Sequence, residues 1–246
     1  MSVSSYGSLS TQLNRINISG NNSFHDCISL SQFVEYMDIR NYFGNSAPQA
    51  AQPVRHTLDK ECYIIAGNLP AELSSDFSDL WNLHPDDFGT VVMYGKQLKT
   101  PRWQQSYIRA YTFSGECHES LPLPEQFQPF LDWANAQTAG QDYNSCLVNW
   151  YENGEHYIGP HRDDERELIK NSEIMSISLG AERIFRIRDY ATKGDQYKQD
   201  IIVRDKTYLI MCGRMQQRFT HEIVKVSGNR GKQCGKRINI TFRKMK

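Results

Sequence analysis

Polar and apolar residues alternate strictly in the last strand-like segment, Arg237–Arg243, which reads Arg-Ile-Asn-Ile-Thr-Phe-Arg. A β-strand sends successive side chains to opposite faces, so the polar residues share one face and the apolar residues share the other. The polar face comprises Arg237, Asn239, Thr241 and Arg243. Two guanidinium groups with hydrogen-bonding residues between them suit a dicarboxylate, because each can fork onto one carboxylate. The alternative is an edge strand whose basic face is solvated.

The same period of two begins at about residue 145, whereas the preceding part of the chain shows helical spacing. One predicted helix follows Pro70 and a second ends before Gly140, and their apolar positions recur three and four residues apart. Strand-like segments follow at 146–151, 175–179, 185–188, 201–203, 208–211, 223–224 and 237–243. Helices followed by many short strands, with no alternating strand–helix units, predict an α+β protein built on an antiparallel sandwich or jelly-roll barrel.

The first 54 residues differ in composition from the rest. They are rich in Ser, Asn and Gln, contain a weakly apolar stretch at 33–43 that could hold a short helix, and end in a linker-like stretch rich in Ala, Gln and Pro at 46–53. We therefore expect a mobile appendage at 1–54 and one globular domain at 55–246.

Composition excludes several classes of protein. Because 28 basic residues balance 28 acidic ones, contact with nucleic acid would depend on local patches. The six cysteines form no Cys-x-x-Cys pair, which is typical of reduced thiols rather than of a disulfide framework or a zinc site. With no apolar run of membrane-spanning length and no signal-peptide core, we expect a soluble intracellular protein with no membrane contact.

A metal site is predicted by His161-Arg162-Asp163, in which an imidazole and a carboxylate at i and i+2 point the same way on an extended chain. A second histidine would complete the two-His, one-carboxylate triad that binds Fe(II) in non-haem oxygenases. His221, shortly before the polar strand, is our candidate. A competing pair, His84-Pro85-Asp86, follows the first predicted helix at a proline, and we assign it to a turn.

These motifs resemble the AlkB-type branch of the Fe(II)/2-oxoglutarate-dependent dioxygenases, and in particular the animal AlkB homologues that repair alkylated DNA. The similarity spans roughly residue 85 to the C-terminus and is highest at 149–154, 158–165 and 237–243. It includes the run His-Arg-Asp-Asp-Glu-Arg-Glu at 161–167. The resemblance implies a double-stranded β-helix (jelly-roll) core with N-terminal helices packed on it and a nucleotide-recognition hairpin as a lid.

The resemblance implies roles for individual residues in the iron and cosubstrate sites. Iron ligation falls to His161, Asp163 and His221, and these ligands with Arg243 form the catalytic set. The family's 2-oxoglutarate positions correspond to Asn149, Tyr151, Arg237, Asn239, Thr241 and Arg243. In the family the first arginine of the strand and the tyrosine hold the distal carboxylate, and the last arginine lies near the carboxylate beside the keto group. O₂ is the second cosubstrate.

The resemblance also implies a nucleobase pocket. The positions that contact the damaged base correspond to Tyr111, Phe113, Ser114, Asp164 and Glu165, and the hairpin that enters the base stack corresponds to Tyr94, Gly95 and Lys96. A base that is to be oxidised must leave the stack and enter a pocket. Two basic stretches, at 96–102 and 230–236, are candidates for phosphate contact. Trp150 falls on the opposite strand face from Asn149, which predicts a core position.

The implied activity is oxidative dealkylation of bases such as 1-methyladenine and 3-methylcytosine in DNA, a DNA repair reaction that releases formaldehyde, succinate and CO₂. The same chemistry on RNA is an alternative. A non-catalytic nucleic-acid-binding module on this fold is disfavoured because every iron and cosubstrate position carries the expected residue. For such a repair enzyme we expect a monomer, located in the nucleus if the organism is eukaryotic and in the cytoplasm otherwise.

Overall fold

The structure of the chain is a computed structural model that describes residues 52–73, 75–93, 96–113, 116–138, 142–191 and 198–246. The expected N-terminal appendage and the short helix expected at 33–43 lie outside the described residues, apart from the last residues before the first strand. That strand begins at Val54, one residue before the expected start of the globular domain. No helix in these described ranges is both long enough and apolar enough to cross a membrane.

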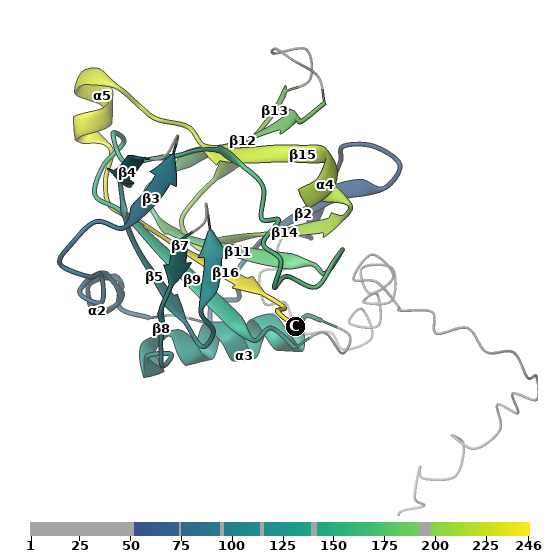
Figure 1. Cartoon of the computed structure of the whole chain (residues 1–246), viewed down its shortest axis with the longest axis horizontal. Helices are drawn as coiled ribbons and strands as arrows, with labels where there is room; N and C mark the ends of the chain where they lie inside the picture. Colours follow the sequence, from purple (N-terminus) through teal and green to yellow (C-terminus); the bar gives the residue numbers. More distant parts are fainter. Residues whose placement is uncertain (1–51, 74, 94–95, 114–115, 139–141, 192–197) are drawn as a thin grey trace, which may run out of the picture.

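The larger of two facing sheets has eight strands, and every pair of neighbours is antiparallel except the last. The order across the sheet is β1-β2-β14-β11-β16-β9-β5-β8. These strands are β1 Val54–Thr57, β2 Cys62–Asn68, β14 Thr207–Gly213, β11 Ile174–Gly180, β16 Arg237–Arg243, β9 Ser145–Tyr151, β5 Trp103–Tyr107 and β8 Ser120–Leu121. Strands that are close in space therefore come from distant parts of the sequence, as in a jelly roll (Figure 1).

The smaller sheet has four antiparallel strands in the order β10-β15-β12-β13. Their bounds are β10 Ile158–His161, β15 Phe219–Ile223, β12 Arg183–Asp189 and β13 Lys198–Val203. One buried apolar cluster lies between the sheets and includes Tyr151, Phe185 and Met211. All seven residues of β9 and of β16 are buried, so the polar face of β16 lies inside the protein and the alternative of a solvated edge strand is wrong.

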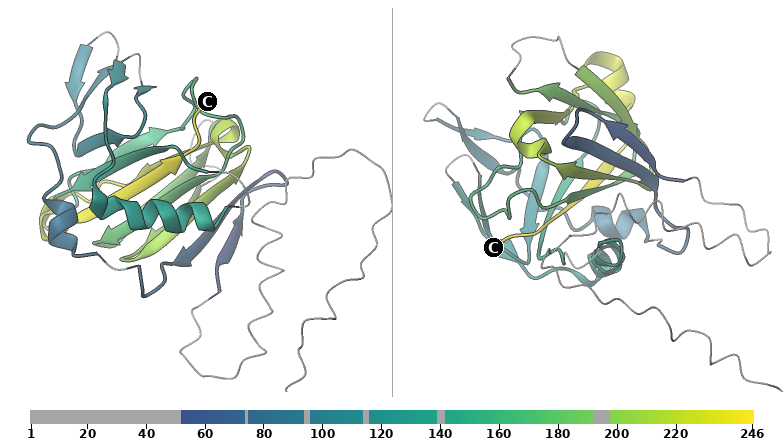
Figure 2. Two further views of the ribbon diagram at one scale, coloured as in Figure 1. Left: turned by 90° about the horizontal axis from the view of Figure 1, so that it is seen from below. Right: turned by 90° about the vertical axis from the view of Figure 1, so that its right-hand side faces the viewer.

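Helices cover the outer face of the larger sheet. The α-helices α2 (Phe77–Trp81) and α3 (Gln128–Ala136), with the 3-10 turn η2 (Glu125–Phe127), contribute Leu80, Phe130 and Ala134 to a second buried cluster with the outer face of that sheet. Figure 2 shows α3 lying across the strands. Trp150 belongs to this cluster, where its indole N–H donates to the Leu80 carbonyl at 3.0 Å, so its predicted core position is confirmed.

The part of the chain before residue 145 contains more strand than the periodicity predicts. Besides β1, β2 and β5, it holds two hairpins, β3 (Thr90–Met93) with β4 (Lys96–Lys99) and β6 (Tyr111–Phe113) with β7 (Glu116–His118). Both hairpins extend on the same side of the molecule (Figures 1 and 2). The short helices α4 (Met215–Arg218) and α5 (Gly228–Gln233) precede β15 and β16.

Candidate active site

Strand register brings the predicted cosubstrate residues onto one buried face. Within the larger sheet β16 pairs with β9 on one side and β11 on the other, so Asn239 lies opposite Asn149 and also opposite Ser178. Directly paired residues of an antiparallel ladder point to the same face. The polar residues of β16 therefore share the inner face of the sheet with Asn149, Tyr151 and the two serines of β11, Ser176 and Ser178.

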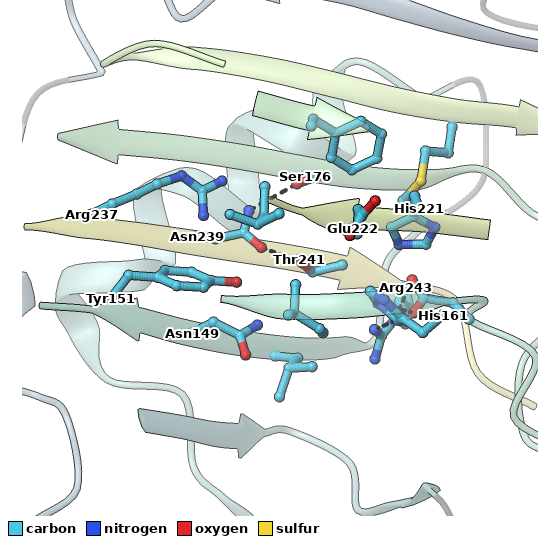
Figure 3. Close-up of a pocket in the computed structure, with 16 residues that line it drawn as sticks. Asn149, Tyr151, His161, Ser176, His221, Glu222, Arg237, Asn239, Thr241 and Arg243 are labelled. Carbon is cyan, nitrogen blue, oxygen red and sulfur yellow. Dashed lines mark hydrogen bonds and ion pairs between the residues drawn. The ribbon is translucent and has the colours of Figure 1, made fainter. Parts of the chain in front are cut away.

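All of these side chains except Ser178 line an elongated cavity between the two sheets. Figure 3 shows Arg237 and Tyr151 at one end and Arg243 with His161 at the other. Asn239 is held between them, because its amide nitrogen donates to Ser176 Oγ at 2.8 Å and to the Ile177 carbonyl at 2.9 Å. A cavity with a cation at each end fits an elongated dianion better than a single charged group.

Arg237 is a buried cation whose hydrogen-bonding capacity is only partly used. Arg237 is only 1% exposed. Its Nη2 donates to Ser178 Oγ at 2.8 Å, whereas Nε and Nη1 make no hydrogen bond within the described part of the chain. Burial lowers its pKa to about 10, with the Tyr151 hydroxyl opposing this effect and Arg183 adding to it.

Arg183 is a second buried cation at this end of the cavity. Its guanidinium lies 5.7 Å from the Tyr151 ring centroid, compared with 5.0 Å for Arg237. The terminal nitrogens of Arg183 donate to backbone carbonyls of the 153–156 segment and of Val224. Arg237 differs from Arg183 in that its Nε and Nη1 groups have no acceptor among the described residues. An incoming carboxylate would both neutralise the charge of Arg237 and accept hydrogen bonds from these groups. The residues at this end of the cavity fit 2-oxoglutarate.

The three predicted metal ligands converge at the other end of the cavity. His161 and His221 are directly paired in the β10–β15 ladder, and their ring centroids are 4.3 Å apart. Asp163 Oδ1 lies 3.8 Å from His161 Nε2. One ligand atom from each residue lies within 4.8 Å of the others, and no other group of three potential ligands was found in the residues that the structure describes.

The environment keeps these ligands in metal-binding protonation states. Burial lowers the pKa of His221 to about 3, with neighbouring His161 adding to the effect, and burial also lowers the pKa of His161. Burial would raise the pKa of Asp163, but Arg243 and both histidines together lower it below its usual range. Two neutral imidazoles and one carboxylate are a donor set that Fe(II) accepts.

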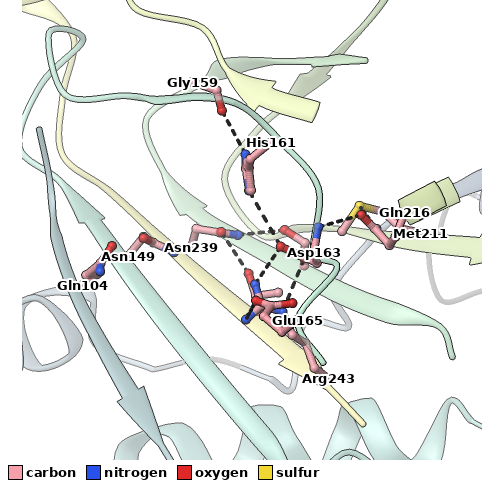
Figure 4. A network of polar contacts seen from close by, with 12 residues as sticks. Gln104, Asn149, Gly159, His161, Asp163, Glu165, Met211, Gln216, Asn239 and Arg243 are labelled. Carbon is pink, nitrogen blue, oxygen red and sulfur yellow. Dashed lines mark hydrogen bonds and ion pairs between the residues drawn. The ribbon is translucent and has the colours of Figure 1, made fainter. Parts of the chain in front are cut away.

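The orientation of His161 also fits metal binding. Its Nδ1–H donates to the Gly159 carbonyl at 2.9 Å, which leaves the Nε2 lone pair facing Asp163 (Figure 4). A hydrogen bond from the ring nitrogen that does not bind the metal commonly fixes the tautomer of a ligating histidine. The competing pair is different: His84 lies in a bend, where it stacks on Trp103 with ring centroids 4.4 Å apart. Asp86 lies in the same irregular segment.

Arg243 lies at the metal end of the cavity, beside two carboxyl groups. Its guanidinium donates to the Asp163 carboxylate at 2.9 and 3.3 Å, and it also lies 3.5 Å from Glu165. Burial raises the pKa of Glu165 to about 7, an effect that Arg243 opposes and Asp163 reinforces. A predicted base-contacting carboxyl therefore lies beside the predicted iron ligand, with its side chain only 3% exposed.

The structure describes only some of the other predicted substrate residues. Lys96 is exposed at the start of β4, and the exposed Asp164 pairs with Arg162 at 2.6 Å. Tyr111 and Phe113 belong to β6, for which the structure describes the backbone only. Tyr94, Gly95 and Ser114 lie outside the described residues.

Arg102 was expected to contact phosphate, but it is buried instead, at 6% exposure. Its Nε donates to Asn149 Oδ1 at 2.7 Å and its Nη2 donates to Gln104 Oε1 at 3.0 Å. Since the Asn149 oxygen is used in this way, the NH₂ group of Asn149 remains as the donor for the cavity. Exposed lysines at 96, 99, 232 and 236 and the exposed Arg230 remain in the two basic stretches.

Several contributors to the site escaped sequence reasoning. Ser176 and Ser178 alternate with apolar residues in β11, so the face argument applied to β16 could have identified them. Arg102 and Arg183 have no such signal, because nothing in their local sequence indicates the partner that lies across the fold.

Comparison with known proteins agrees with this geometry. A profile of the 2OG-Fe(II) oxygenase superfamily matches residues 82–243. The Homo sapiens protein named DNA oxidative demethylase ALKBH2 is 30% identical over 214 residues, which cover 82% of this chain and 80% of that protein. The Arabidopsis thaliana protein of the same name is 28% identical over 240 residues, covering 84% and 75% of the two chains.

Two further matches are a relative that aligns over a shorter stretch and a solved structure. The Homo sapiens alpha-ketoglutarate-dependent dioxygenase alkB homolog 3 is 32% identical over 139 residues, covering 54% of this chain and 47% of that protein. The solved structure of OsALKBH1 matches with a TM-score of 0.52 and 18% identity, covering 78% of this chain and all of the other. This last likeness is evidence for the fold alone.

Proposed function

The chain belongs to the 2OG-Fe(II) oxygenase superfamily, and from that premise we propose that it removes alkyl groups from nucleobases, with 1-methyladenine and 3-methylcytosine in DNA as substrates. Enzymes of this superfamily are dioxygenases that use Fe(II), 2-oxoglutarate and O₂. The observation that carries the proposal is the buried cavity with the His161, Asp163 and His221 group at one end and the partly satisfied Arg237 at the other.

In the proposed site, His161, Asp163 and His221 would hold the iron. Arg237 and Tyr151 would bind the distal carboxylate of 2-oxoglutarate, and Arg243 would interact with the carboxylate beside the keto group. Asn149 donates from its amide, which Arg102 holds in place, and Asn239 with Thr241 fills the side of the cavity between the two arginines.

The chemistry that the bound iron supplies, with 2-oxoglutarate and O₂, is insertion of one oxygen atom into a C–H bond, with release of succinate and CO₂. On an N-methylated base, the product N–CH₂OH group loses formaldehyde as the nitrogen recovers its proton or lone pair. The protein's part is to hold the methyl carbon near the iron. We assign this positioning to Glu165 and Asp164, with the β6 residues Tyr111 and Phe113 and with Ser114.

The nucleic-acid substrate is supported by the relatives and by the hairpins. The first relatives carry the name DNA oxidative demethylase. The β3–β4 hairpin presents exposed Lys96 and Lys99, which suit phosphate contact. We propose that this hairpin, whose two strands are joined in the sequence by Tyr94 and Gly95, is a lid that opens the duplex. We also propose that residues 1–54 are an appendage to a catalytic domain at 55–246.

Mass spectrometry of methylated oligonucleotides tests the proposal. Single-stranded DNA, duplex DNA and RNA carrying 1-methyladenine or 3-methylcytosine are incubated with protein, Fe(II) and 2-oxoglutarate, and both loss of one methyl group and succinate are measured. Asp163→Ala is the inactive control. We expect demethylation of DNA coupled to succinate. Demethylation of RNA but not of DNA would show that RNA is the substrate. Formation of succinate without loss of methyl from any of the oligonucleotides would refute a nucleobase substrate.

A further inference from the structure

Asp163 lies in a segment that has no regular backbone pairing. The chain leaves β10 at His161, and residues 162–165 belong to no helix or strand. The backbone N–H of Asp163 therefore has no ladder partner. It donates instead to the side-chain oxygen of Gln216, Oε1, at 3.0 Å, which is the only hydrogen bond of this N–H within the described part of the chain (Figure 4).

The other end of the Gln216 amide is also held. Its Nε2 donates to the sulfur of Met211, 3.4 Å away, and Met211 is buried on β14 at the edge of the cavity. A backbone N–H can only donate, so the amide oxygen of Gln216 must face Asp163 and the NH₂ group must face the sulfur. The amide has a single orientation.

Gln216 connects two parts of the site that are far apart in sequence. It belongs to α4, which leads directly into β15 and His221, whereas Asp163 follows β10 and His161. The Asp163 carboxylate is also drawn toward Arg243 Nη2, which lies 2.9 Å away. The carboxylate thus lies between His161 Nε2, 3.8 Å away, and Arg243, so its place depends on where the backbone of Asp163 is held.

We propose that Gln216 is a positioning residue that anchors the Asp163 backbone so that the Asp163 carboxylate completes the metal site with His161 and His221. The inference rests on the proposed metal site. Groups that orient a metal ligand commonly contribute about 10- to 100-fold to metal affinity, and Gln216 acts in this way through the main chain.

Gln217 provides a matched control on the same helix. It is half-buried like Gln216, but its side chain donates to Asn171 Oδ1 at 2.6 Å and accepts from Arg214 Nε at 3.1 Å. Replacing Gln217 with methionine removes the same amide from the same helix without touching the N–H of Asp163.

The experiment measures binding of Mn²⁺ alone to the full chain by titration calorimetry, for wild type, Gln216→Met, Gln216→Glu, Gln217→Met and Asp163→Ala. We expect Gln216→Met to weaken Mn²⁺ binding about 10- to 100-fold, Gln217→Met to leave it within about twofold of wild type, and Gln216→Glu, which keeps an acceptor oxygen, to restore most of it. Thermal unfolding without metal should be similar for the two methionine variants.

The outcomes separate the inference from the function on which it rests. If wild type and Asp163→Ala bind Mn²⁺ alike, the metal site itself is wrong. If Asp163→Ala abolishes binding while Gln216→Met binds like wild type, only the role of Gln216 is wrong. Hydrogen exchange of the Asp163 amide in wild type needs no variant: we expect protection, and exchange at the rate of an exposed loop would overturn the anchor.

Discussion

Replacing Arg237 with methionine should weaken cosubstrate binding without destabilising the protein that lacks cosubstrate. Arg237 is a buried cation with two nitrogens that make no hydrogen bond among the described residues. Lowering its pKa from the ordinary arginine value to about 10 corresponds to about 3 kcal/mol of unfavourable free energy for the charged form, at about 1.36 kcal/mol for each pKa unit. Methionine removes that cost and fills similar volume.

The hydrogen bond from Arg237 to Ser178 offsets part of this gain. A hydrogen bond from a charged group contributes about 1.5–3 kcal/mol, so the free energy of unfolding of the cosubstrate-free variant should be unchanged or higher by up to about 1.5 kcal/mol. The binding of 2-oxoglutarate should weaken by about 2–5 kcal/mol, because one partner of a buried charge pair is lost. That is about 30-fold to several thousandfold in affinity.

The assay is titration calorimetry of 2-oxoglutarate into the Mn²⁺-loaded protein without oxygen, together with denaturant unfolding with and without 2-oxoglutarate. Lys236→Met is the matched control, because Lys236 is the exposed sequence neighbour of Arg237 and lies outside the cavity. Its 2-oxoglutarate affinity should equal that of wild type. If Arg237→Met binds 2-oxoglutarate normally, or if it loses about 2 kcal/mol or more of stability without cosubstrate, Arg237 is a structural residue and the reasoning fails.

Three further predictions concern the metal, the pH and the polymer. Asp163→Ala should abolish 2-oxoglutarate turnover while Asp86→Ala leaves it nearly intact, and equal losses would show that the wrong His-x-Asp pair was chosen. Burial raises the pKa of Glu165 from 4.5 to about 7, so its ionisation lowers the free energy of unfolding as pH rises across that interval. The lowered pKa values of His161 and His221 contribute the opposite slope up to their ordinary value of 6.5. In metal-free denaturant unfolding, Glu165→Gln should therefore make the free energy of unfolding rise more steeply with pH than it does in wild type, and an unchanged slope would show that Glu165 does not contribute in this way. Tyr94→Ala should reduce activity on duplex DNA more than on single-stranded DNA, since opening a duplex costs a few kcal/mol; the same loss on both would leave Tyr94 no role in strand opening.

The local pattern of the sequence determined which side chains act together. The pleat of a strand is a property of the chain itself, so the alternation in 237–243 placed four polar residues on one face before any partner strand was known. The same argument put His161 and Asp163 within reach of one another and sent Trp150 to the opposite face from Asn149. Each of these relations depends on residues fewer than ten positions apart.

Only the tertiary structure decided what those faces meet. Whether the polar face of β16 is solvated or buried depends on the second sheet, which comes from other parts of the chain and closes over it. The strand β2 was missed because both of its faces are covered, which removes the alternation that marks a half-buried strand. In the sequence Arg102 resembles a surface charge, but the fold buries it beside Asn149. Gln216 contacts Asp163 only because α4 packs against the segment that follows β10. Periodicity in the sequence indicates which face of its own element a residue lies on. Hydrogen-bond partners and burial depend instead on which distant segments pack against that face, and this is determined by the whole fold.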